Sequence, residues 1–304
     1  MNIAFCINKL MFMGLGVTIS SLLRNCSDTQ RLSLWFLCSN LTSKDKNRIL
    51  DLLEVENYKG IYHFEDFDSV KTFGKFAALH GDWTTYGRLL LPEIVDEDKV
   101  LYLDADLVVE VDVLELDFFN FNKLPLAAVG GGFFKYALGR TFYLEKLGID
   151  PDLEYFNAGV VLFNLKEWRS SGLKDECLKI AALYPKELPS HDQSLLNIIC
   201  MGQFAKLPAK FNCYWMANQM KPQLAKKMIM HFVGSPKPWD PFGSIIHNGH
   251  RTWKKYLHKT WTNNLNQISF LTLRRAYYLR YSYGRYLQNK IFESRYKINV
   301  SKFF

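Results

Sequence analysis

Short apolar runs alternate with segments of helical periodicity along the first hundred residues, and this alternation limits the possible folds more than any other feature. Each run has the length of one strand, and the run at 2–7 has the pattern of a buried strand. Strands that alternate with helices imply βαβ units and a mostly parallel sheet, that is, an α/β fold. We expect strands at 2–7, 32–38 and 60–66, a strand that ends at Asp104, and helices at 16–25, 43–55 and 84–95.

The same alternation continues beyond Asp104. Residues 159–165 predict a buried strand followed by the start of a helix, and residues 190–200 predict a helix whose first turn is polar. Residues 229–239 begin as a short apolar strand and continue into a loop rich in glycine and proline. Ser43 is the predicted N-cap of the helix at 43–55.

The positive charge of the chain is confined to its C-terminal end. The chain has 304 residues, 48% of them hydrophobic, which is enough for one large domain or a domain with an appendage. Its net charge is +8, yet residues 251–304 contain 12 Lys and Arg and only one acidic residue, so the rest of the chain is slightly acidic. We predict a domain at 1–248 and a basic, aromatic-rich helical tail at 249–304.

Cysteine usage and the N-terminus bear on the cellular compartment. The six cysteines form no C-x-x-C pair and show no zinc-like spacing, which favours free thiols in a reducing compartment. Asn8 and Lys9 interrupt the apolar N-terminus, so a first strand and helix explain it better than a signal peptide. No other stretch approaches the roughly 20 unbroken apolar residues of a membrane span.

Two carboxylates follow the apolar run that ends at Leu103. Asp104 and Asp106 flank Ala105, and side chains at i and i+2 of a strand point to the same face. Two such carboxylates repel one another unless a cation lies between them, and hard oxygen ligands suit Mg²⁺ or Mn²⁺. An EF-hand is excluded by the apolar residues that follow. Three interpretations remain: a solvated turn, a haloacid-dehalogenase-like phosphohydrolase with Asp104 as nucleophile, and a nucleotide-sugar transferase.

Three further segments carry candidate groups, and each also has a purely structural interpretation. In "HFVGSPKPW", His231 can ligate a metal, Gly234 permits close backbone approach, and Lys237 suits a phosphate. Alone, such a histidine is more often structural. In "NAGVVLFN", Asn157 can bind a sugar hydroxyl or cap a strand. In "HDQSLLN", Asp192 and Gln193 begin a helix, where an acid is also favoured by the helix dipole.

Together and in this order, "TTYGRLLLPE", "VLYLDADLVV", "YFNAGVVLFNL", "HDQSLLN" and "HFVGSPKPW" resemble glycosyltransferase family 8, which includes glycogenin and bacterial lipopolysaccharide galactosyl- and glucosyltransferases. The resemblance covers roughly residues 1–240. It implies a GT-A fold, a UDP-hexose donor, Mn²⁺ or Mg²⁺, and retention of the anomeric configuration.

The resemblance also implies roles for single residues. Asp104, Asp106 and His231 would bind the metal, with Ala105 and the carboxylates beside the donor. Gly234 and Lys237 would contact the diphosphate.

The same resemblance places further residues around the donor. Arg88 would approach it near the carboxylates, and Asn157 would face the hexose. Asp192 and Gln193 would be the catalytic residues, with Gln193 close to the anomeric carbon. Retention allows either a double displacement through Asp192 or same-face attack by the acceptor, and the poor nucleophilicity of an amide favours the second.

One segment departs from the family pattern. The family's first strand usually ends in an acidic pair followed by Asn-Tyr, which holds the uracil and ribose, whereas this chain has Asn8, Lys9 and Met11 there. Asn8 can still bind a base edge, but Lys9 reverses a charge and Met11 removes a stacking surface. The departure leaves room for a catalytically inactive, glycan-binding homologue.

The tail predicts a partner of its own. Residues 251–304 contain 13 aromatic residues besides the 12 basic ones, a combination typical of helices at anionic membrane surfaces. The alternatives are a solvated tail packed on the domain and a nucleic-acid patch, but no nucleic-acid-binding fold accompanies it. We therefore expect a cytoplasmic protein, peripheral on the inner membrane, that transfers a hexose to a saccharide or lipid-linked glycan and binds no nucleic acid.

Overall fold

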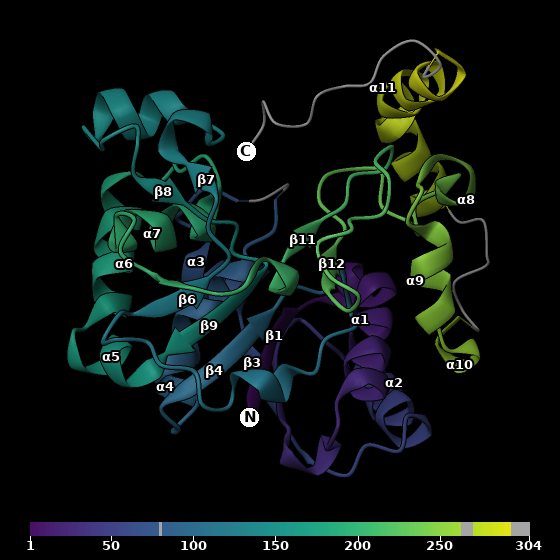
Figure 1. Ribbon diagram of the computed structural model, residues 1–304, viewed down its shortest axis with the longest axis horizontal. Coiled ribbons are helices and arrows are strands. Elements are labelled where there is room, and N and C mark those ends of the chain that lie inside the picture. Colours follow the sequence, from purple (N-terminus) through teal and green to yellow (C-terminus); the bar gives the residue numbers. More distant parts are fainter. Residues whose placement is uncertain (79–80, 263–269, 293–304) are drawn as a thin grey trace.

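The computed structural model describes residues 1–78, 81–262 and 270–292 (Figure 1). The parts of the predicted tail at 263–269 and 293–304 lie outside the described residues. A central sheet runs through the molecule, with helices on both of its faces. The predicted α/β class is confirmed.

The central sheet has seven strands in the order β10-β6-β9-β4-β1-β2-β3. All neighbours pair in parallel except β9, which runs antiparallel to both β4 and β6. The strands are β1 (Asn2–Ile7), β2 (Ser33–Ser39), β3 (Ile61–Phe67), β4 (Lys99–Leu103), β6 (Leu126–Ala128), β9 (Val160–Asn164) and β10 (Ala205–Lys206).

Two smaller sheets flank the carboxyl ends of this sheet. The first has the order β11-β12-β5, and the second is the β7-β8 pair. Their strands are β5 (Leu107–Val109), β11 (Cys213–Tyr214), β12 (Ile229–His231), β7 (Gly132–Phe133) and β8 (Glu154–Tyr155). The segment at 125–133 is divided between β6 and β7.

Alternate side chains of the central strands enter two separate cores. On β1, Ile3 and Phe5 pack with α1 (Phe12–Asn25) and α2 (Ser43–Val55), while Ala4 faces the other core. The second core lies under α4 (Leu91–Ile94), α5 (Leu165–Ser170), α6 (Leu173–Leu183) and α7 (His191–Cys200). Burying one large apolar side chain stabilises a fold by about 1.5–3 kcal/mol, so this two-sided burial fixes the sheet between its helices.

Helix ends and breaks follow from local chemistry. The N-cap of α2 is Thr42 rather than the predicted Ser43, because Thr42 and Asp45 form a reciprocal capping box. The helix predicted at 84–95 is a 3₁₀ segment over Thr84–Leu90 followed by α4. Pro92 has no N–H to donate to the preceding turn, which explains why a new helix begins there.

The chain continues from the sheet domain through α8 (Gly243–Ile246), α9 (His250–Tyr256) and α10 (Lys259–Thr262) to α11 (Phe270–Phe292). Trp253 and Trp261 are buried in the domain, and the Trp261 indole donates to the Phe12 carbonyl at 2.8 Å. The helices just after residue 248 thus belong to the packed interior, and the division there stays a prediction. Among the described helices, none has the length and apolar character needed to cross a membrane.

All six cysteines are described and none forms a disulfide, as the sequence predicts. Five of them are buried and Cys26 is partly buried. Burial raises the pKa of the Cys26 thiol to about 11.

Candidate active site

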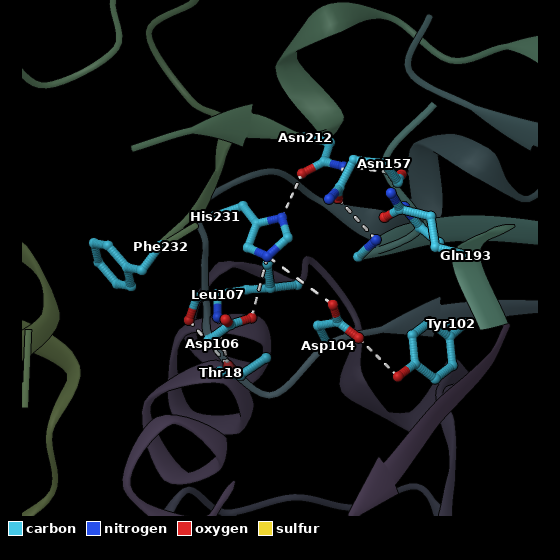
Figure 2. A network of polar contacts seen from close by, with 12 residues as sticks. Thr18, Tyr102, Asp104, Asp106, Leu107, Asn157, Gln193, Asn212, His231 and Phe232 are labelled. Carbon is cyan, nitrogen blue, oxygen red and sulfur yellow. Dashed lines mark hydrogen bonds and ion pairs between the residues drawn. The ribbon is translucent and has the colours of Figure 1, made fainter. Parts of the chain in front are cut away.

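The two carboxylates lie where the chain passes from one sheet to another. β4 ends at Leu103, and β5 begins at Leu107 in the smaller sheet. The Asp104 amide donates to the Gly159 carbonyl at 2.8 Å, and the Asp106 carbonyl accepts from the Phe232 amide at 3.0 Å. These backbone bonds fix the crossing, so Asp104 and Asp106 project together at the carboxyl end of β4 (Figure 2).

His231 reaches the carboxylates through strand pairing. It ends β12, which runs antiparallel to β5 with His231 opposite Leu107. His231 Nε2 lies 3.2 Å from Asp106 Oδ1 and 4.0 Å from Asp104 Oδ2, and the three ligand atoms lie within 4.8 Å of one another. The structure thus brings the three predicted metal ligands together.

A residue that sequence reasoning missed orients the imidazole. The Asn157 side-chain oxygen accepts a hydrogen bond from the Gly159 amide, which identifies it as the oxygen of that amide group. Asn212 therefore donates its Nδ2 to Asn157 Oδ1 at 3.1 Å. The other end of the Asn212 amide, Oδ1, then faces His231 Nδ1 at 3.0 Å. An amide oxygen only accepts, so Nδ1 carries a proton and the lone pair of a neutral His231 is on Nε2, toward the carboxylates. A lone asparagine before a two-residue strand gives no signal in the sequence.

The carboxylates have opposite electrostatic surroundings. Burial acts to raise the pKa of Asp106, but the Lys237 ammonium, 2.6 Å from Oδ2, and His231 together outweigh it and hold that pKa below its usual range. Burial raises the pKa of Asp104 against the pull of Arg88, and the Asp106 charge adds to this rise. Asp106 Oδ1 is buried and accepts no hydrogen bond of good geometry, although His231 lies nearby. A further cation would relieve both features.

Arg88 is near the carboxylates as predicted, but it is only 2% exposed. Its guanidinium lies 3.1 Å from Asp104 Oδ1 and 2.9 Å from Asp192 Oδ2, and donates to the Ala158 carbonyl at 2.6 Å. Asp192 Oδ1 also accepts from the Thr85 hydroxyl at 2.7 Å. Arg88 therefore joins Asp104 to Asp192 through a buried network.

Gln193 has a fixed orientation at the start of α7. Its Oε1 accepts from the Ala158 amide at 3.0 Å, and its Nε2 donates to the Tyr155 hydroxyl at 2.9 Å. Gln193 and Asn157 lie on the same side of the carboxylates in Figure 2. Tyr155, which the sequence did not single out, is thus a support for a predicted catalytic residue.

At the end of β1, Asn8 contacts an acid that the sequence did not single out. Its Nδ2 donates to Asp82 Oδ2 at 2.6 Å and to the Thr84 hydroxyl at 3.0 Å. Its Oδ1 accepts from the Leu10 amide at 2.9 Å. Asp82 therefore brings a carboxylate close to the strand end where Lys9 stands in place of an acid.

Two glycines shape the backbone at the site. Gly234 has a φ of +72°, which L-amino acids with a side chain adopt at a cost, so the loop after His231 needs this residue. A Cβ on Gly14 would lie 2.2 Å from the carbonyl oxygen of Ala105, so α1 approaches the segment between the carboxylates only because position 14 has no side chain.

Comparisons with known proteins agree with this geometry. Residues 2–242 match the model of glycosyl transferase family 8. A lipopolysaccharide 1,3-galactosyltransferase of Salmonella typhimurium is 26% identical over 80% of this chain and 74% of its own length. A lipopolysaccharide 1,2-glucosyltransferase of Escherichia coli is 31% identical over 47% of this chain and 44% of its own.

A solved structure gives the fold. The galactosyltransferase LgtC, in complex with donor and acceptor sugar analogues, superposes with a TM-score of 0.70 at 24% identity, over 90% of this chain and 100% of LgtC. The predicted GT-A fold is confirmed, and the phosphohydrolase alternative is set aside. The chain therefore belongs to glycosyl transferase family 8 and is a glycosyltransferase.

Proposed function

We propose that this glycosyltransferase transfers glucose or galactose from a UDP-sugar to a saccharide acceptor, with retention of the anomeric configuration. The observation that carries the proposal is the cluster of Asp104, Asp106 and His231, in which one buried carboxylate oxygen accepts no hydrogen bond. The relatives that act on lipopolysaccharide support a role in the synthesis of lipopolysaccharide or another surface glycan.

The cluster fits a divalent cation. Two carboxylates supply negative charge, and Asn212 turns the Nε2 lone pair of His231 toward them. This oxygen-rich set with one imidazole suits Mn²⁺, and Mg²⁺ less usually because of the nitrogen ligand. When bound, such an ion neutralises the charge that develops on the departing diphosphate.

Residues of the chain complete the donor site in this proposal. Lys237 provides a second positive charge for the leaving UDP, and Gly234 lets the backbone approach the phosphates. Asn8 and its partner Asp82 lie at the end of β1, where the resemblance places the base.

The contacts of Asp192 bear on the route to retention. Both of its carboxylate oxygens are engaged, one by Arg88 and the other by Thr85. Use of Asp192 as a nucleophile would break a buried ion pair, which is costly. We therefore favour same-face attack by the acceptor, with Gln193 and Asn157 lining the hexose and the departing phosphate taking the acceptor's proton.

A donor-hydrolysis screen tests the proposal. Purified protein is incubated with UDP-galactose, UDP-glucose and other nucleotide sugars with Mn²⁺ or Mg²⁺, and nucleotide release is measured. We expect UDP release from one of the two hexose donors, stopped by a chelator. Absence of both binding and hydrolysis of every UDP-hexose would contradict the proposal and favour an inactive homologue. Phosphate release from simple phosphate esters would revive the hydrolase alternative.

Asn212 offers a test of the metal assignment that does not need catalysis. Asn212→Ala removes the acceptor that fixes the His231 tautomer, and loss of such an outer partner lowers metal affinity about 10- to 100-fold. Mn²⁺ affinity is measured by calorimetry on the purified protein. Asn248→Ala is a matched control, because the hydrogen bonds of Asn248 within the described residues go to Gln219 and Ala217, outside the site. Unchanged Mn²⁺ affinity in Asn212→Ala would contradict this role.

We further propose that the protein acts at the cytoplasmic face of an anionic membrane, through α11. Three tyrosines of α11, Tyr277, Tyr278 and Tyr281, are more than 60% exposed, and Arg280 packs on two of their rings. This basic-aromatic surface matches the chemistry of lipid headgroups. A saccharide acceptor linked to lipid would be presented there.

Vesicle sedimentation measures the membrane contact. The full chain is expected to pellet with vesicles containing phosphatidylglycerol. Arg274→Glu together with Arg280→Glu is expected to weaken this binding about thirtyfold, because each of the two basic residues contributes about 1 kcal/mol near the surface. Vesicles of phosphatidylcholine alone are the control. Equal sedimentation with both kinds of vesicle would contradict the electrostatic contact.

A further inference from the structure

α11 contacts the loop that carries Lys237. Arg275, in the second turn of α11, directs Nε to Asp240 Oδ1 at 3.0 Å and Nη2 to Asp240 Oδ2 at 2.9 Å. Nη2 also donates to the Ser235 hydroxyl at 3.2 Å. The Asp240 side chain is 7% exposed, so this two-pronged pair is largely shielded on the side of the carboxylate. One arginine thus spans the loop from Ser235 to Asp240.

Asp240 connects Arg275 to Lys237. Its Oδ2 accepts from the Lys237 amide at 2.7 Å, and its own amide donates to the Lys237 carbonyl at 3.1 Å. The Lys237 ammonium in turn lies 2.6 Å from Asp106 Oδ2. A continuous set of polar contacts therefore runs from Arg275 through Asp240 and Lys237 to a carboxylate of the candidate metal cluster.

A small apolar cluster packs α11 against α8. Leu279 and Tyr283 follow Arg275 at intervals of four residues, so the three side chains share one face of α11. Leu279 and Tyr283 pack against Ile246 of α8, and the Tyr283 ring lies 5.7 Å from that of Phe242. Figure 1 shows α11 beside α8, apart from the central sheet. With so few apolar partners, the Arg275–Asp240 pair is a main determinant of how α11 meets the loop.

We infer that Arg275 is a positioning residue that acts through Asp240 to hold Lys237 ready for a nucleoside diphosphate. The inference rests on the proposed function, in which Lys237 binds the diphosphate of the donor. Arg275 has two effects on that site: it fixes the carboxylate that orients the Lys237 backbone, and it neutralises a negative charge beside an anion-binding loop. Docking of α11 thereby sets the affinity of the site for its donor.

The position of the Arg275–Asp240 pair indicates whether its loss should affect nucleotide binding or the stability of the fold. The Arg275 side chain is 43% exposed, and the pair lies outside the two cores that pack against the central sheet. Loss of the pair should therefore weaken nucleotide binding more than it weakens the fold. The chemical step should change little, because Arg275 does not contact the reacting groups.

Nucleotide affinity of full-length variants tests the inference. UDP binding in the presence of Mn²⁺ is measured by calorimetry, and donor hydrolysis gives KM and kcat. In Arg275→Met we expect the UDP Kd and the donor KM to rise about tenfold, with kcat within about twofold of the wild-type value. Arg275→Lys should recover part of the affinity. Arg285→Met is the matched control, since the described contact of Arg285 is with the Tyr286 ring of the same helix, and it should bind UDP as the wild type does.

Two further variants separate positioning from general destabilisation. Asp240→Asn should raise the UDP Kd as Arg275→Met does. If Arg275→Met fails to fold, Asp240→Asn tests the inference in its place. In a Lys237→Met background, Arg275→Met should have little additional effect on UDP affinity, since the two act on one unit. If the wild-type chain binds UDP and either Arg275→Met or Asp240→Asn binds it equally well, the inference is overturned and the proposed function stands. A wild-type chain that binds no nucleoside diphosphate overturns the proposed function and the inference with it.

Discussion

Asp106→Asn is expected to reduce metal-dependent release of UDP about a hundred- to a thousandfold, the range found when one preorganised electrostatic group is removed from an active site. The substitution keeps the shape of the side chain but removes the charge that faces both His231 and Lys237. The Lys237 ammonium then loses its carboxylate partner at 2.6 Å, and the cluster retains only one acid. Initial rates over a range of Mn²⁺ concentrations measure the loss.

The control for Asp106→Asn is an exposed aspartate in the central sheet. Asp66, in β3, is paired with Lys46, and its side chain is 66% exposed, so Asp66→Asn should leave the rate unchanged. Circular dichroism of both variants verifies that they are folded. An Asp106→Asn protein with wild-type turnover and wild-type Mn²⁺ dependence would remove Asp106 from the metal site and with it the main support for the proposed chemistry.

The central sheet was predictable because its strands carry strong local signals. The runs at 2–7 and 32–38 each contain a single polar residue, and the structure places β1 (Asn2–Ile7) and β2 (Ser33–Ser39) there, side by side in parallel. The direction of β9 was not predictable in this way. An apolar run shows that a strand is buried, but its direction depends on the connections at its ends, and β9 runs antiparallel to both neighbours.

The site was predictable where its residues form patterns. Asp104 and Asp106 follow an apolar run, and His231 ends another, so their types and positions are visible in the sequence. Asn212 and Tyr155 orient predicted residues, yet they lie at or beside strands of two residues, which are too short to show any periodicity. Such supports are found only when the fold places them next to their partners.

Burial of charge is a second property that the sequence hides. Arginine is seldom fully buried, and nothing around Arg88 in the sequence distinguishes it from an exposed residue. In the structure two carboxylates, Asp104 and Asp192, compensate its charge, and they come from segments far apart in the chain. A charged side chain can be placed in the interior only when its partners are known.

A chain that ends at Gly249 is expected to lose most of its stability. It lacks the three aromatic residues that α9 and α10 insert into the domain: Trp253, Tyr256 and Trp261, each at most 4% exposed. Replacing one large buried aromatic residue by alanine costs about 3–5 kcal/mol, and a whole domain is stable by only about 5–15 kcal/mol. The deletion would also expose the residues that Trp261 covers, including Phe12 and Gly16.

A chain that ends at Thr262 provides the comparison. It keeps all three aromatic residues and loses α11, whose described contacts with the domain are a small apolar cluster around Ile246 and Phe242 and the ion pair between Arg275 and Asp240. Its midpoint of thermal unfolding should therefore stay close to that of the full chain, while the protein ending at Gly249 should be insoluble or unfold at a much lower temperature. Trp261→Ala in the full chain gives an intermediate case, with an expected loss of about 3–5 kcal/mol. Equal unfolding midpoints for the chain ending at Gly249 and the full chain would show that the packing of α9 and α10 adds nothing to the stability of the domain. The domain would then end near residue 248, as the charge distribution of the sequence predicts.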